Sequence, residues 1–209
     1  PNGAKLVFSA MKNGLTDLFL YDIAAGTHEQ LTYDLADDLS PRYSKSGDHI
    51  IFSSNRIHDT LTFGREYDKE VGMNFDLFLY DIMSRSPYLT RLAEDKYVDK
   101  FNAHNIKDNE YLYLGNQSGV LNRYYSRFDS AISYIDTTIH YRYFAESQPI
   151  TNYNRSILEE DFSPYSQTYG EVVLEDGKYN MYFGQMFPED IEYVDKPIET
   201  VFRKQYTKD

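Results

Sequence analysis

Cysteine and tryptophan are both absent from this 209-residue sequence. Without thiols the chain has no disulfide bonds, no cysteine-ligated zinc and no cysteine nucleophile. Long apolar runs are missing as well: none approaches the roughly 18 residues of a membrane-spanning helix, so we expect no membrane-spanning segment. Basic residues are few, with 21 Lys and Arg against 33 Asp and Glu, and the formal net charge of −12 disfavours binding to nucleic acid.

Tyrosine and phenylalanine are abundant, with 21 and 13 copies. Tyrosine suits pleated, half-buried surfaces, where its ring packs and its hydroxyl reaches water, so this aromatic content indicates β structure. Hydrophobic residues make up 41% of the chain, which is enough for a real core.

A heptapeptide, Asp-Leu-Phe-Leu-Tyr-Asp-Ile, occurs at 17–23 and again at 76–82, and a degenerate third copy ends at Arg127-Phe128-Asp129. An identical string in so short a chain indicates a structural repeat. Its four consecutive apolar or aromatic residues fit a strand that is buried on both faces, as in a stack of β-sheets.

Similar elements surround each heptapeptide. A strand centred on a Phe-Ser pair precedes it, and the tight turn Asn13-Gly14 joins the two strands in the first unit. A Leu-Thr strand follows, and an extended strand containing Pro41 leads into the next unit. Four antiparallel strands per unit form the blade of a β-propeller, so we predict an all-β propeller with four-stranded antiparallel blades. We expect one domain over 1–209, with about four blades at 1–35, 36–95, 96–155 and 156–195 and a tail at 196–209.

The first unit begins at its second strand, since nothing before Pro1 supplies the first. Four blades also lie at the lower limit of closed propellers. We therefore expect an incomplete propeller or a fragment of a longer chain. Closure would come from the rest of that chain, from a second copy or from the tail at 198–202. The start at Pro1, without Met, likewise predicts a mature form or an excised piece.

Two insertions interrupt the repeat. The segment from Ile57 to Asn74 replaces a tight turn and is rich in charge, so we expect a surface loop. The second insertion covers roughly 130–146 and fits either a short helical face over 131–135 or a β-hairpin that includes 138–144. The two insertions join different strand pairs, which emerge at opposite faces of a blade, so they need not form one site.

The stretch from Ser40 to Arg56 resembles the signature Pro-x-Trp-Ser-Pro-Asp-Gly-x-x-Ile-x-Phe-x-Ser-x-Arg of the TolB-like (PD40/WD40-like) β-propeller repeat family. Tyr43 stands where that family usually has Trp, whereas Ser44, Gly47, Phe52 and Arg56 match. The resemblance implies a protein-binding propeller of the bacterial cell envelope, periplasmic or associated with the outer membrane. Similar blades also cover the active site of prolyl-oligopeptidase-type peptidases, whose catalytic domain would lie outside this chain.

The sequence offers few candidates for catalytic or metal-binding residues. No Gly-x-Ser-x-Gly nucleophile motif occurs, and the five His residues never pair at metal-ligand spacing, so we expect no catalytic residues, metal or cofactor. The repeated acidic residues at 17, 22, 76 and 81 fit turn hydrogen bonds, or alternatively a ring that holds a cation. The Tyr-rich segments at 124–125 and 141–143 fit either core or recognition surface.

We therefore predict a protein or peptide partner that binds at the long loops. The expected contact region is the first insertion and its start, namely Arg56, His58, Arg65 and Tyr67.

Overall fold

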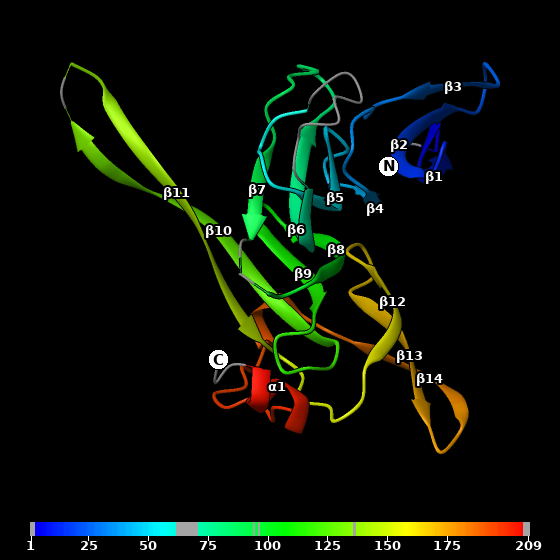
Figure 1. Cartoon of the computed structure of the whole chain (residues 1–209), viewed down its shortest axis with the longest axis vertical. Helices are drawn as coiled ribbons and strands as arrows, with labels where there is room; N and C mark the ends of the chain where they lie inside the picture. The colour runs from blue at the N-terminus through cyan, green and yellow to red at the C-terminus, as the bar shows by residue number, and fades with distance from the viewer. Residues whose placement is uncertain (1–2, 62–70, 94, 96, 136, 207–209) are drawn as a thin grey trace.

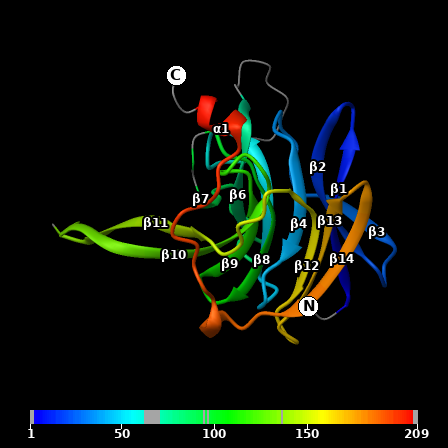
Figure 2. The same ribbon diagram turned by 90° about the horizontal axis from the view of Figure 1, so that it is seen from below.

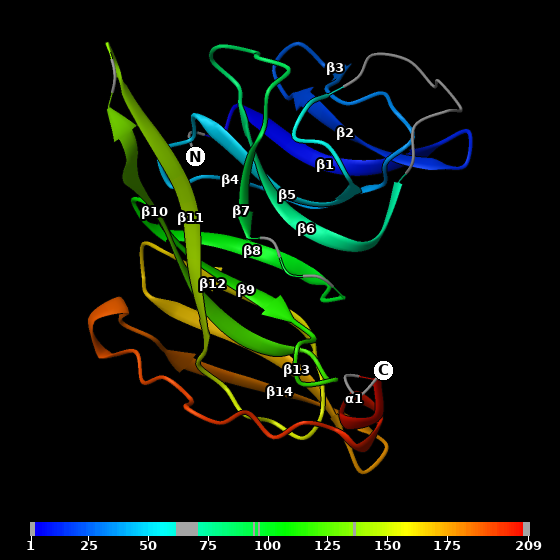
Figure 3. The same cartoon turned by 60° about the vertical axis from the view of Figure 1, so that its left-hand side comes forward.

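The computed structural model describes residues 3–61, 71–93, 95, 97–135 and 137–206. These residues form four antiparallel β-sheets, which we number I to IV in chain order. The sheets are stacked face to face from the N-terminal sheet to the last, as Figure 3 shows from top to bottom. This is the arrangement of propeller blades, and it confirms the predicted all-β propeller fold.

Sheets II and III have four strands each, and sheets I and IV have three. Sheet I lacks the strand that precedes the Phe-Ser strand, as the sequence predicts. Sheet IV lacks the strand that follows the heptapeptide position. Sheet I consists of β1 (Lys5–Lys12), β2 (Leu15–Asp22) and β3 (Thr27–Gln30), and sheet II of β4 (Asp38–Tyr43), β5 (His49–Arg56), β6 (Val71–Asp81) and β7 (Thr90–Ala93).

The third sheet carries the most prominent feature of the molecule, a long hairpin that stands away from the stack (Figures 1 and 2). Sheet III consists of β8 (Lys100–Lys107), β9 (Glu110–Gly115), β10 (Asn122–Ile135) and β11 (Ile139–Pro149). Sheet IV consists of β12 (Ile157–Ser163), β13 (Thr168–Glu175) and β14 (Lys178–Gln185). A 3₁₀ turn, η1 (Pro188–Asp190), and a short helix, α1 (Val201–Tyr206), follow.

The heptapeptide is the third strand of the propeller unit and is buried on both faces, as predicted. In β2, alternate residues face opposite sides, so Leu18 and Leu20 pack toward sheet II while Phe19 faces the other way. In β6, Leu77 packs toward sheet III and Phe78 toward sheet I. β6 therefore contributes to two interfaces of the stack, whereas β2, which belongs to an end sheet, contributes to one.

An aromatic pair marks the same position in three successive sheets. Phe8 faces Phe19, Phe52 faces Phe78, and Tyr113 faces Tyr124 in the strand registers. The ring centroids of these pairs lie 5.7, 5.9 and 5.4 Å apart. This register aligns residues 122–128 with the heptapeptide, so the third copy begins one residue earlier than the sequence comparison places it.

Tight turns form where the sequence predicts them. Asn13 and Gly14 have φ values of 56° and 83°, and Asp176 and Gly177 have 49° and 75°. Positive φ at both central residues is the requirement of a type I′ turn, which Asn-Gly and Asp-Gly meet at low cost.

The tail folds back onto sheet III. The Thr200 amide donates to the Ser118 carbonyl, and the Ile198 amide donates to the Asn152 side chain. These contacts place the short helix α1 beside the turn between β9 and β10 (Figure 3). The tail therefore covers one end of sheet III.

Candidate functional site

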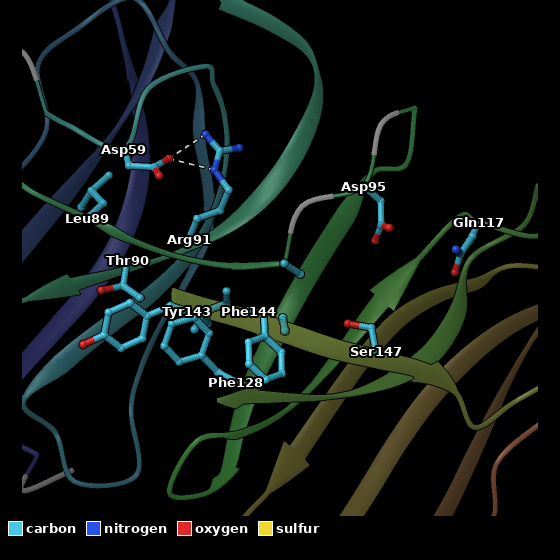
Figure 4. A pocket seen from close by; sticks show the side chains of 13 residues that line it. Asp59, Leu89, Thr90, Arg91, Asp95, Gln117, Phe128, Tyr143, Phe144 and Ser147 are labelled. Atoms are coloured by element: carbon cyan, nitrogen blue, oxygen red, sulfur yellow. Dashed lines mark hydrogen bonds and ion pairs between the residues drawn. The ribbon is translucent and has the colours of Figure 1, made fainter. Parts of the chain in front are cut away.

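A cleft of about 830 Å³ lies between the outer strand of sheet II and the long hairpin of sheet III (Figure 4). Its walls come from β7 on one side and from the β10–β11 hairpin on the other. The side chains that matter for its chemistry are those of Asp59, Arg91, Asp95, Phe128, Tyr143 and Ser147.

Unequal strand lengths create the cleft. β9 pairs only with residues 122–127 of β10, whereas β10 and β11 continue to pair with each other as far as Ile135 and Ile139. We call residues 128–135 and 139–145 the arm. Because β7 has only four residues, the outer strand of sheet II ends early and leaves the base of the arm exposed to solvent.

The wall on the arm is aromatic. The rings of Phe128 and Tyr143 are stacked, with centroids 5.8 Å apart and planes only 3° from parallel. Phe128 lies opposite Ala145 in the strand register, and Tyr143 opposite Ser130. Tyr143 is 63% exposed, so the stack offers a flat apolar surface to a ligand.

The opposite wall is fixed by Arg91. Its Nε donates to Asp59 Oδ1 at 2.8 Å, one terminal nitrogen donates to Asp76 at 2.6 Å, and the other to the Ile57 carbonyl at 2.8 Å. The guanidinium also lies 4.6 Å from the centroid of Phe78. All three guanidinium nitrogens therefore bond oxygens of the protein itself. These bonds connect the start of the first insertion to the edge of sheet II.

Acidic groups dominate the exposed charge of the cleft. The carboxylates of Asp59 and Asp95 are both partly exposed. Lys100 is fully buried, with Nζ 2.8 Å from Asp76 Oδ1 and 3.6 Å from Asp95 Oδ2. Among the described residues that line the cleft, the one cation, Arg91, is already paired, so a ligand meets the partly exposed carboxylate oxygens.

The backbone of β7 is a second source of contacts. β7 is the outermost strand of sheet II, and within the described part of the chain no strand pairs with its outer side. Just before it, the Leu89 amide donates to the Asp59 carbonyl, and the Leu61 amide donates to the Pro87 carbonyl. The edge is therefore rigid at its start and open along Thr90–Ala93.

The sequence-predicted contact residues fall in different environments. Arg56 is buried, donates to Asp34 at 3.1 Å and to Asp38 at 2.7 Å, and serves the fold rather than a surface. Burial raises the pKa of Asp38, and the Arg56 charge offsets part of that shift. His58 is exposed at the start of the first insertion. Arg65 and Tyr67 lie outside the described residues.

The first insertion is not wholly a surface loop. Leu61 is only 4% exposed and belongs to the core between sheets I and II, and Val71 to Asn74 are part of β6. The expectation of a loop from 57 to 74 holds for the exposed residues 57–59 but was wrong at Leu61, which is core, and at 71–74, which extend a strand.

The second insertion is a β-hairpin and not a helix, since β10 and β11 pair throughout it. Its Tyr-rich segment supplies Tyr143 to the cleft. The other Tyr-rich segment is mainly core, with Tyr124 fully buried. Arg91 had no motif to mark it, and Phe128 was marked only as part of the degenerate third heptapeptide copy. The Tyr-rich segment at 141–143 was the other signal available for the cleft.

Two of the four repeated aspartates, Asp22 and Asp81, accept turn hydrogen bonds as expected, and the other two, Asp17 and Asp76, contact side chains of other strands. Asp22 accepts a turn hydrogen bond from the Ala25 amide, and Asp81 accepts from Met83 and Ser84. Asp76 pairs with Arg91 and Lys100, and Asp17 accepts from the Gln30 side chain. Among the described residues, no three His, Cys, Asp or Glu side chains are grouped to hold a metal ion.

A second hollow, of about 460 Å³, lies among the inner strands β1, β4, β8 and β12. Arg42 lines it and bonds Asp161 at 2.8 Å, and the Tyr165 hydroxyl donates to the Lys45 carbonyl at 3.3 Å. This hollow lies on the inner side of the sheets and is distinct from the cleft at the arm. No helix in the described residues has the length and apolar character to cross a membrane.

Comparison with known proteins identifies the fold. No family model and no curated protein matches the sequence. Among solved structures, TolB from Acinetobacter baumannii superposes with a TM-score of 0.64 at 14% identity, over 92% of this chain and 40% of that one. A TolB-type protein from Agrobacterium tumefaciens gives 0.63 at 16% identity, over 92% of this chain and 61% of that one.

Hydrazine synthase from Kuenenia stuttgartiensis gives a TM-score of 0.56 at 12% identity, over 86% of this chain and 30% of that one. The chain therefore has the TolB-like propeller fold, and it spans less than two thirds of the length of these structures.

Proposed function

We propose that this chain is a non-catalytic protein-interaction module of the bacterial cell envelope, periplasmic or associated with the outer membrane. Its TolB-like fold and the repeat signature over Ser40–Arg56 support this assignment. The site of interaction is the cleft between β7 and the arm, which is the observation that carries the proposal.

The cleft suits an extended segment of a partner protein. An extended peptide adds to an open sheet edge through its backbone, and pockets for alternate side chains supply selectivity. Here β7 offers the edge, and the Phe128–Tyr143 stack offers an apolar surface beside it. Asp59 and Asp95 favour a basic side chain, and the net charge of −12 attracts a basic partner at long range.

Peptide selection followed by titration tests the proposal. A random nonapeptide library displayed on phage is selected on the purified chain, and a synthetic copy of the consensus peptide is titrated by calorimetry. We expect an aromatic or aliphatic residue beside Lys or Arg in the consensus, and affinity that falls as salt rises.

The variant Tyr143→Ala should weaken binding about tenfold or more, since an exposed ring at the centre of a contact carries much of the energy. Tyr165→Ala removes an exposed tyrosine at the inner hollow and serves as the matched control, with unchanged affinity expected. If Tyr165→Ala weakens peptide binding and Tyr143→Ala does not, the peptide binds at the inner hollow, and the proposal is contradicted.

The contribution of the first insertion remains a prediction. Asp59 and His58 lie at its described start, and Arg65 and Tyr67 follow in the segment outside the described residues. We expect Arg65→Ala combined with Tyr67→Ala to weaken binding of the same peptide. Unchanged affinity in this variant would confine the site to β7 and the arm.

A further inference from the structure

We propose that the two end sheets of the stack form complementary docking faces. In this arrangement the outer face of sheet IV in one copy of the chain packs on the outer face of sheet I in a second copy, head to tail. The interface would repeat a contact that the chain already makes between its own sheets.

The internal contact has a defined form. Between sheets I and II, Leu18 and Leu20 of β2 pack into the same core as the ring pair Phe52 and Phe78. All four side chains are buried. Two branched apolar residues at alternate positions of one sheet thus face an aromatic pair of the next.

The same form recurs between sheets II and III. Leu77 and Leu79 of β6 hold the positions of Leu18 and Leu20 in the heptapeptide, and they pack on the ring pair Tyr113 and Tyr124. The interface between sheets III and IV is polar instead. There Arg123 pairs with Glu160 and Glu171, and its guanidinium lies 4.4 Å from the centroid of the Tyr169 ring.

Sheet IV presents the leucine-type side of this contact to solvent. Its β13–β14 hairpin has the same two-residue turn as the β1–β2 hairpin, with Lys12 opposite Leu15 and Glu175 opposite Lys178. This alignment places Met181 and Phe183 at the positions of Leu18 and Leu20. They are 65% and 75% exposed, whereas their counterparts are buried.

Sheet I presents the aromatic side. The Phe8–Phe19 pair corresponds to Phe52–Phe78 and lies on the face turned away from sheet II, because Leu18 and Leu20 occupy the other face. Phe8 is 39% exposed, and Leu6 beside it is 54% exposed. Phe19 is only 7% exposed and lies near the His28 ring, so Phe8 and Leu6 are the members of this face that remain open to solvent among the described residues.

One chain thus carries both halves of an interface that it forms twice internally, and this commits the proposal to a second copy as the occupant. Contiguous apolar faces of this kind mark interaction surfaces on folded proteins. A contact through unlike faces extends to further copies or closes a ring. Because each copy has a net charge of −12, repulsion opposes the contact and added salt should strengthen it.

Sedimentation velocity on the purified chain tests the proposal through two variants that each block one face. Phe8→Glu blocks sheet I and Phe183→Glu blocks sheet IV. We expect the unmodified chain to sediment above its 24.5 kDa monomer mass as concentration rises, and each variant alone to remain at the monomer mass. An equimolar mixture should form a dimer and stop there, since the one intact pair of faces joins the two variants and both remaining faces carry Glu.

Three results would overturn the proposal: an unmodified chain that stays monomeric at every concentration and salt, self-association of either variant alone, or a mixture that forms no dimer. Circular dichroism checks that the variants fold. Leu6→Glu and Met181→Glu provide a second pair at exposed positions, for which the same mixing result is expected. Tyr143→Ala, which lies on neither face, should associate like the unmodified chain.

Discussion

Single buried arginines hold neighbouring parts of the propeller together. Arg56 joins the end of β5 to Asp34 and Asp38, and its guanidinium lies 5.6 Å from the Phe52 ring centroid. Arg123 joins sheet III to sheet IV through Glu160 and Glu171. Each cation is buried with two carboxylates, so removal of the cation leaves buried charge without compensation.

Arg56→Met should therefore lower the free energy of unfolding by about 3–5 kcal/mol, the range for breaking a buried ion pair from one side. Urea denaturation monitored by circular dichroism measures this change. Arg85→Ala is the control, because Arg85 pairs with Glu29 at the exposed surface and its loss should have little effect. Equal effects of the two substitutions would show that the Arg56 cluster contributes no special stability.

A buried histidine makes stability depend on pH. Burial, and next the charges of Arg42 and Arg123, lower the pKa of His104 to about 3. An unfolded histidine titrates near pH 6.5, so below that pH the unfolded chain binds a proton that folded His104 does not. Its contribution to stability is therefore present above about pH 6.5 and is lost as the pH falls toward 3.

His104→Gln removes this component. Between pH 7 and pH 5 we expect the unmodified chain to lose on the order of 1–2 kcal/mol more stability than the variant. Urea unfolding at both pH values gives the difference directly. The same pH response in both proteins would mean that the pKa of His104 in the fold is close to its unfolded value.

The first insertion illustrates how an element can be part loop and part core. Leu61 packs with Leu18, Phe52 and Leu89, beside the bridge between Thr60 and Tyr88. Leu61→Ala should cost about 2–5 kcal/mol, whereas Ile57→Ala, at an exposed position nearby, should cost much less. Thermal unfolding of both variants checks this. A neutral Leu61→Ala would show that the described start of this insertion contributes no core packing.

The outer part of the arm should be dispensable for folding. A two-stranded hairpin contributes little stability by itself, and beyond residue 127 β10 has no pairing with β9. Replacing 131–142 with Asn-Gly should change the free energy of unfolding by less than about 1 kcal/mol. It should also leave Phe128, Tyr143 and the cleft in place. If the shortened chain unfolds, the arm is a structural element and not an appendage.

At the scale of the whole molecule, the parts of the fold that could be predicted from the sequence are those that repeat. The heptapeptide, the Phe-Ser strands and the Asn-Gly turn predict strands, order and fold class, because each is a local pattern with one favourable geometry. The cleft could not be predicted in this way. It arises where the short β7 lies beside the long hairpin, and Arg91 and Tyr143 are brought to it by the packing of two sheets rather than by a motif.

The buried role of Arg56 also escaped prediction. The repeat signature placed it at the start of a charged insertion, and a charge run is usually a solvated surface. Its partners Asp34 and Asp38 come from the chain before β5, and only the folded register shows that all three meet in the interior.

Hydrogen–deuterium exchange with and without the selected peptide is the most direct test of the central claim, that the cleft between β7 and the arm binds an extended partner segment. We expect slower exchange of the β7 amides at Thr90–Ala93 and at the base of the arm near Tyr143, since the peptide covers both. The β12 amides at the inner hollow should be unchanged. Protection of the β12 amides with the β7 amides unchanged would show that the peptide binds elsewhere and would contradict binding at the cleft.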